Sequence, residues 1–174
     1  MNISNLISII ISVAAILIST LNSFLNFRQN SFTNQSLKAD KTSQVVDMFL
    51  NEVVVVYDTY IDSEMRSQKE VVESLPSGAD LVDDQTTLYV LELVSNILIT
   101  DRIKVLNVLE RASLAAVTQP ILLESLYGSI GFDFLEIFTK FESTINEFPK
   151  HKFNSIRILR TKFSKYNLGD ERND

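Results

Sequence analysis

Few residues in this chain have the types and spacing that chemistry requires. Asp80, Asp83 and Asp84 cluster in a segment, residues 74–85, that contains proline and glycine and is predicted to be a loop. A calcium-binding loop needs oxygen ligands at alternate positions, a central glycine and a terminal glutamate. That spacing is absent, so we interpret the cluster as a solvated acidic loop rather than a metal site.

The other candidates for catalysis are no stronger. His151 is the single histidine and lies between two lysines, and residues 128–131 (GSIG) do not form the G-x-S-x-G nucleophile motif. Without cysteine the chain has no thiolate metal site, and one histidine does not form a histidine-rich one. We therefore expect no enzymatic activity, metal or cofactor, and a membrane-anchored enzyme is only our third interpretation.

Basic side chains are concentrated near the C-terminus. The net charge is −6, which disfavours general binding to nucleic acid, yet residues 148–167 contain six basic and no acidic side chains. Apolar residues at helical spacing predict a last helix over about residues 150–166. Its apolar face would hold Phe153, Ile156, Leu159, Phe163 and Tyr166, and the remainder would hold Lys150, Lys152, Arg157, Arg160, Lys162 and Lys165.

Two interpretations of this basic helix remain open. It could contact an anionic membrane surface through Lys152, Arg157, Arg160, Lys162 and Lys165, because polybasic segments are attracted to such surfaces. Alternatively, it could be a bundle helix whose charges balance the acidic stretch between Asp58 and Asp84. We favour the second, because apolar faces of this width usually belong to a core.

The N-terminal segment has a different character, since the first charged side chain is Arg28. The run from Leu6 to Leu21 is almost wholly apolar, and about 20 such residues cross a bilayer. A signal peptide would need a basic start and a cleavage site, and an interfacial helix would need a charged face. We therefore predict a transmembrane anchor over residues 1–27. The basic residues after it place the C-terminal domain in the cytoplasm and the N-terminus outside the inner membrane.

Small and polar residues recur along one side of this predicted anchor. Their spacing of three and four places them on a single stripe, and small residues let membrane helices approach closely. We hypothesise that the stripe is a self-association surface and the chain a homo-oligomer, while the alternative is that serine is simply tolerated there. The stripe is formed by Ser8, Ser12, Ala15, Ser19 and Asn22.

The remainder predicts an all-α domain of about five helices over residues 45–167, after a polar connector at 28–44 and before a disordered tail at 168–174. Helices are expected over residues 43–73, 86–99 and 101–116, although the run of valines from 53 to 56 favours a strand. Thr100 and Asp101 are expected to cap the third of these. In the second, the residues predicted to face inward are Leu88, Leu91, Val94 and Leu98.

Two signals divide the chain beyond residue 117. Pro120 predicts a helix start, because proline suits the first helical position. Gly128 and Gly131 predict a break after Tyr127, followed by an aromatic helix that ends near Pro149. The residues expected on its inner face are Phe132, Leu135, Phe138, Phe141 and Ile145.

The layout resembles a group of uncharacterised bacterial and phage single-pass membrane proteins that have an N-terminal anchor and a cytosolic helical domain. The resemblance is carried by IISVAAILISTLNSFLNFRQ, VVDMFLNEVVVVYDTY and LYVLELVSNILITDRIKVLNVLE. It implies no catalytic residues. Our preferred interpretation is a membrane-tethered interaction or scaffold module with an unknown protein partner. The second is a membrane-acting effector in phage–host conflict, for defence or superinfection exclusion.

Overall fold

The computed structural model describes residues 3–75 and 84–170, and the side chains of residues 16–75 and 86–166. All secondary structure in these ranges is helical, which confirms the all-α prediction. The chain divides into two compact units, residues 1–40 and residues 41–174, and we call the second unit the bundle. Of the tail predicted to be disordered at 168–174, residues 168–170 are helical, and residues 171–174 lie outside the described residues. The side chains of the three loop aspartates also lie outside them.

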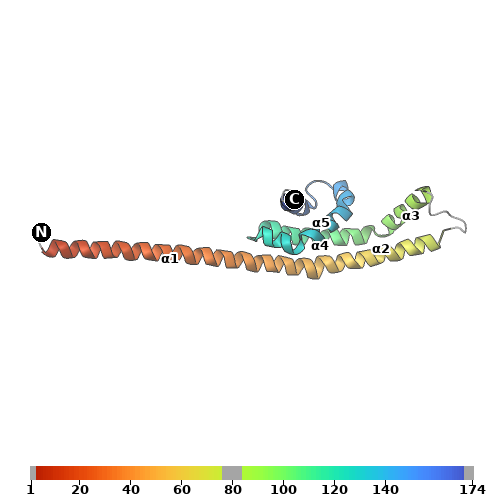
Figure 1. Cartoon of the computed structure of the whole chain (residues 1–174). Coiled ribbons are helices and arrows are strands. Elements are labelled where there is room, and N and C mark those ends of the chain that lie inside the picture. Colours follow the sequence, from red (N-terminus) through yellow and green to blue (C-terminus); the bar gives the residue numbers. More distant parts are fainter. Residues whose placement is uncertain (1–2, 76–83, 171–174) are drawn as a thin grey trace. The chain divides into compact units, whose positions relative to one another are not determined.

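The first unit is a single helix. Helix α1 runs from Ile3 to Met48 and contributes its last residues to the bundle (Figure 1). The polar connector expected at residues 28–44 is therefore a continuation of the N-terminal helix. Every side chain from residue 16 to residue 40 is exposed.

The valine-rich stretch continues this helix through an unusual turn. Residues Phe49–Val54 form a π-helical turn, η1, and α2 follows from Val55 to Glu73. A π turn bonds residue i to residue i+5 and so accommodates one extra residue. Val45, Phe49 and Val53 are spaced four apart and are all buried. The helical pattern, not the β propensity of the valines, decides the structure here.

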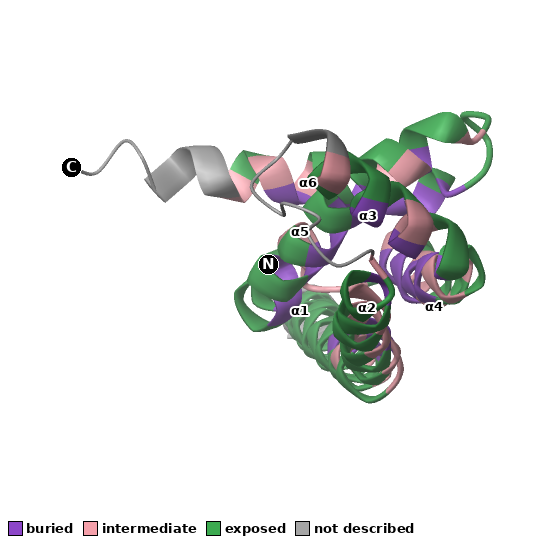
Figure 2. Cartoon of the chain, turned by 90° about the vertical axis from the view of Figure 1, so that its right-hand side faces the viewer, coloured by how far each residue is buried: buried purple, intermediate pink, exposed green. Residues whose placement is uncertain are grey.

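The other bundle helices are α3 (Asp84–Ile97), α4 (Ile99–Thr118), α5 (Leu123–Glu147) and α6 (Asn154–Asp170). Helix α4 is central: it packs against η1, α2, α3 and α6, and α5 also packs on α6. Figure 2 shows buried residues facing one another between α4, α5 and α6. Five helical segments thus build the bundle in the described residues, as predicted: the continuous α1–η1–α2 segment, α3, α4, α5 and α6.

Several predicted boundaries are wrong. Helix α5 runs without interruption through Gly128 and Gly131, and it begins at Leu123 rather than beside Pro120. A side chain at Gly131 would overlap the ring of Tyr127 one turn earlier, so this glycine provides space for an aromatic ring and does not break the helix.

The predicted starts of two other helices also change. Helix α4 begins at Ile99 with no side-chain cap, so Thr100 and Asp101 do not cap it. Helix α6 begins at Asn154, because residues 150–153 form a turn in which Phe153 adopts the left-handed conformation, φ 57°. Lys150 and Lys152 therefore precede the helix.

The predicted inner faces are partly correct. Of the face predicted for the last helix, Ile156, Leu159 and Phe163 of α6 and Phe153 of the turn before it are buried, whereas Tyr166 is half-buried. In α5, Phe138, Phe141 and Ile145 are buried. Phe132, however, is 79% exposed. In α3 Val90 and Val94 are buried, as is Leu98 directly after it, whereas Leu88 and Leu91 are exposed. The buried residues are spaced four apart, so two of the four expected residues, Val94 and Leu98, are correct.

Candidate functional site

Three features of the described residues could serve function. The first is the exposed helix of the first unit, the second is a polar chain with a neighbouring groove in the bundle, and the third is the basic C-terminal helix.

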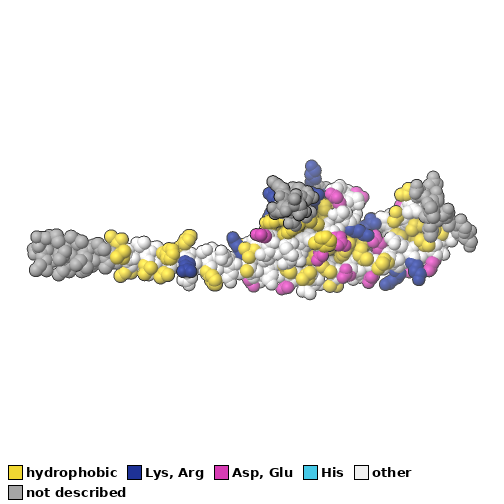
Figure 3. All heavy atoms as spheres, viewed as in Figure 1, with side chains coloured by type: hydrophobic (Ala, Val, Ile, Leu, Met, Phe, Trp, Pro, Cys, Tyr) yellow, Lys and Arg dark blue, Asp and Glu magenta, His cyan; other side chains and the backbone are white. Residues whose placement is uncertain are grey.

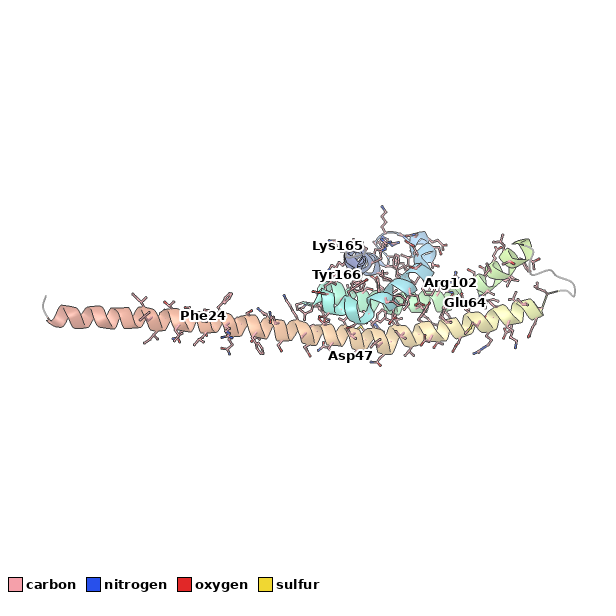
Figure 4. The ribbon with its side chains drawn as sticks, viewed as in Figure 1. Phe24, Asp47, Glu64, Arg102, Lys165 and Tyr166 are labelled. Carbon is pink, nitrogen blue, oxygen red and sulfur yellow. The ribbon has the colours of Figure 1, made fainter. Side chains whose placement is uncertain are left out.

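The helix of the first unit carries many large apolar side chains that nothing in its own unit buries. Phe24 is shown on this helix in Figure 4, and Leu17 and Leu21 are 64% and 58% exposed. A soluble domain normally buries such a run, and an isolated helix in water gains little stability from its own backbone. The exposed apolar residues in this part are Ile16, Leu17, Ile18, Leu21, Phe24, Leu25, Phe27, Phe32 and Leu37.

The predicted anchor and stripe overlap this helix only in part. Ser19 and Asn22 are exposed on it, whereas Ser8, Ser12 and Ala15 lie outside the residues whose side chains are described. Over the described part of the chain, the structure contains no helical stretch that is both long enough and apolar enough to cross a membrane.

In the bundle, a chain of polar contacts links three helices. Tyr60 of α2 is buried, its hydroxyl donates to Glu64 at 3.1 Å, and it accepts a bond from Arg102 of α4 at 3.4 Å. Glu64 also binds the ammonium group of Lys140 of α5 at 2.6 Å. Figure 4 shows Glu64 and Arg102 close together near the start of α4. Glu64 and Lys140 form an ion pair, and Arg102 is linked to them through the Tyr60 hydroxyl, so the contacts join α2, α4 and α5.

Two tyrosines beside this chain are shifted in their acidity. Burial raises the pKa of Tyr60, nearby Glu64 adds to the rise, and Arg102 opposes it. Burial also raises the pKa of Tyr57, with a further contribution from Glu136. A tyrosine with a raised pKa stays protonated at neutral pH, so neither residue is prepared to act as a base or a nucleophile.

An open groove of about 720 Å³ lies next to Tyr57, between α2 and α5. Aromatic and aliphatic groups form most of its walls, with one carboxylate and one ammonium group at the edge. Such a groove is better suited to binding an apolar side chain of a partner than to catalysing a reaction. Its lining residues are Tyr57, Tyr127, Phe132, Leu135, Glu136, Thr139 and Lys140. Among the described residues, no group of acidic or histidine side chains is arranged to hold a metal ion.

The basic helix α6 is positioned by two caps that the sequence did not reveal. The carboxylate of Glu110, from α4, accepts the backbone N–H groups of Ser155 and Ile156 at 3.1 and 3.0 Å. Arg157 donates to the carbonyl of Ile145 near the end of α5. A third contact, from the N–H of Leu122 to the hydroxyl of Thr42 at 2.8 Å, ties the α4–α5 loop to the end of α1. These bonds join residues distant in sequence, and no local pattern signals them.

The five predicted membrane-contact residues therefore differ in availability. Arg157 is used in the cap on α5, and Arg160 lies over the ring of Phe138 at 5.4 Å. Lys152 lies 4.2 Å from the ring centre of Phe148. Lys165 is exposed and Lys162 is half-buried on α6. The structure thus keeps four of the five cations on the surface and assigns Arg157 a structural contact.

No protein-family model, curated protein or solved structure matches this chain.

Proposed function

We propose that the protein is a membrane-tethered helical interaction module that associates with itself. The observation that carries this proposal is the N-terminal helix: it has no charged residue before Arg28, and its large apolar side chains from Ile16 onward are exposed. Exposed apolar surface of this extent needs a partner outside its own unit, and a lipid bilayer supplies one.

The dimensions and polar groups of this helix fit a bilayer. Residues 6–25 would span about 30 Å at 1.5 Å per residue, which is the thickness of the hydrocarbon core. The hydroxyl of Thr20 donates to the carbonyl of Ile16 at 2.8 Å, so this polar group is satisfied within the helix. Arg28, Lys38 and Lys41 follow the segment, and on the positive-inside rule they favour a cytoplasmic bundle at the inner membrane.

The bundle would act as the binding part of the module. Its groove beside Tyr57 is open and mostly apolar, and Phe132 at its edge is largely exposed. The charged groups next to the groove are Glu136 and Lys140. An apolar side chain flanked by polar groups on a protein partner would match this arrangement. Tethering and self-association would present several such grooves at once, which raises avidity.

Alkaline extraction of membranes tests the tether. We expect the full chain to stay in the membrane pellet and the Leu17→Lys/Leu21→Lys variant to be released, because each lysine near the centre of a span costs about 2.5–3.5 kcal/mol. The matched control is Leu88→Lys/Leu91→Lys, which alters two α3 leucines of similar exposure, 65% and 51%. Release of the unmodified chain, or equal release of both variants, would refute the tether.

Disulfide crosslinking tests self-association, because the chain has no cysteine of its own. Ser19→Cys lies on the proposed stripe, and Leu17→Cys lies on the opposite side of the same helix. We expect oxidation of membranes to form covalent dimers with Ser19→Cys much faster than with Leu17→Cys. Equal rates for the two variants would show that the stripe is not the contact surface.

A further inference from the structure

Among the residues whose side chains are described, the cations of the C-terminal helix and the turn before it form no ion pair. Between residues 148 and 167 there are six basic and no acidic side chains. The ion pairs of the described residues join other bases, including Lys140 with Glu64 and Lys69 with Glu73. Within that part of the chain, no carboxylate lies within 4 Å of a basic group of residues 150–165. The acidic residues of this stretch whose side chains are described, from Asp58 to Glu73, therefore do not form the expected balance as ion pairs.

These cations are held on a rigid support. The apolar side of α6 is buried in the core, and Glu110 fixes the first turn of the helix. Lys150 and Lys165 are exposed and Lys162 is half-buried, while Lys152 and Arg160 lie over the rings of Phe148 and Phe138. Lys and Arg side chains gather beside the C-terminal helix in Figure 3, and Figure 4 shows Lys165 there. We call Lys150, Lys152, Arg160, Lys162 and Lys165 the basic face.

We propose that the basic face binds the anionic lipid headgroups of the membrane that holds the N-terminal helix. This inference rests on the proposed tether, which keeps the bundle near the bilayer at high effective concentration. Four of the five cations are lysines, which act as mobile point charges and suit a fluid, diffuse array of phosphates. Each lysine near such a surface increases the docked population about fivefold.

A lipid surface fits the charge distribution better than nucleic acid. Residues 1–147 contain 19 acidic and 9 basic side chains, so the remainder of the chain would repel a long polyanion. A flat surface that meets only one edge of the bundle avoids most of this repulsion, because charges more than about 8–10 Å away are screened at physiological salt. Ile158, on the same outer arc and 38% exposed, adds an apolar contact.

The test uses the full chain with a single cysteine, Thr161→Cys, on the exposed arc of α6 and labelled with a fluorophore. The chain is reconstituted into phosphatidylcholine nanodiscs with or without 30% phosphatidylglycerol, a fraction of the headgroups carrying a nitroxide quencher. We expect strong quenching only in the anionic discs and its loss at high salt. Lys150→Gln/Lys162→Gln/Lys165→Gln should reduce the ratio of docked to undocked protein about a hundredfold.

The matched control removes three exposed cations elsewhere on the bundle, Arg66→Gln/Lys69→Gln/Lys104→Gln, and should leave quenching unchanged. Equal quenching in neutral and anionic discs, or equal losses in both triple variants, would overturn the proposal. Loss of quenching when a short DNA duplex is added at physiological salt would also overturn the proposal, because nucleic acid would then be the preferred ligand of the basic face.

Alkaline extraction separates the two proposals. A chain that resists extraction but shows no anionic quenching retains the tether and refutes the basic face. A chain that is extracted, yet binds anionic vesicles in a salt-dependent manner that requires the three lysines, refutes the tether and supports the basic face.

Discussion

Similar apolar side chains are buried in the bundle and exposed in the first unit. In the bundle, leucines, isoleucines and phenylalanines of α4, α5 and α6 are buried in a common core, as Leu109, Phe134 and Ile156 illustrate. In the first unit, Leu17, Leu21 and other residues of the same types remain exposed. Burying one such side chain is worth about 1.5–3 kcal/mol. The bundle gains this free energy from its own residues, whereas the first unit must obtain it from a partner outside itself.

The polar groups show the same contrast. The bundle satisfies buried ends of helices with side chains that are distant in sequence, through Glu110 for α6 and Arg157 for α5. In the first unit, the hydroxyls of Thr20 and Thr33 donate to carbonyl groups of their own helix. The bundle is therefore specified by tertiary contacts, and the first unit by local helical geometry.

The largest effect should come from the aromatic core of the bundle. Phe134→Ala removes a fully buried ring that meets Phe163 edge-on at 5.3 Å, and we expect the free energy of unfolding of the bundle to fall by about 3–5 kcal/mol. Phe132→Ala, on the same helix but exposed, should change it by less than about 0.5 kcal/mol. Chemical unfolding of both variants measures the difference. Equal losses would contradict the assignment of the core.

A smaller effect should follow from uncapping α6. Glu110→Ala leaves two partly buried N–H groups without their acceptor, so we expect a loss of about 1–3 kcal/mol in the same assay. Glu142→Ala, an exposed glutamate on α5, serves as the control and should be nearly neutral. An equal effect of the two substitutions would show that the cap does not stabilise α6.

The two glycines of α5 should respond with opposite signs. Gly128→Ala points into open space and should stabilise the helix by up to about 1 kcal/mol. Gly131→Ala would overlap Tyr127, whose ring stacks on Tyr166 at 5.3 Å, and should destabilise the bundle by about 1–2 kcal/mol. Thermal unfolding of the two single variants is the measurement. Stabilisation by both would show that the ring moves without cost.

The smallest effect should come from removing the first unit. Deletion of residues 1–36 leaves one helical turn before Thr42 and touches none of the core residues. We expect the unfolding free energy of the bundle to change by less than about 0.5 kcal/mol. A loss of several kcal/mol would mean that the bundle depends on the first unit for its stability.

Periodicity in the sequence predicted the all-α class and most of the inner face of α6, because apolar residues spaced three and four apart lie on the same side of a helix. It failed where a residue's role depends on a distant neighbour. In the sequence, Gly131 suggests a helix break. In the structure, the lack of a side chain at Gly131 leaves room for the ring of Tyr127. Leu88 and Leu91 were expected in the core and are exposed, whereas Val94 and Leu98 are buried as expected and Val90 is buried as well.

For the candidate functional features as well, the sequence shows which residues are present but not which distant residues they contact. The concentration of cations after residue 148 is visible in the sequence, and the structure adds which of them are used internally. The series of polar contacts from Arg102 through Tyr60 and Glu64 to Lys140 joins three helices, and no spacing in the sequence predicts it.

Cysteine reactivity along α1 tests the membrane tether most directly. Single cysteines replace Leu17, Leu21 and Asn34, all exposed in the structure, and native membranes are treated with a water-soluble maleimide. If the bilayer covers the apolar part of the helix, Leu17→Cys and Leu21→Cys should stay unlabelled while Asn34→Cys reacts fully, and detergent unfolding should make all three reactive. Equal labelling of the three cysteines in intact membranes would contradict the account.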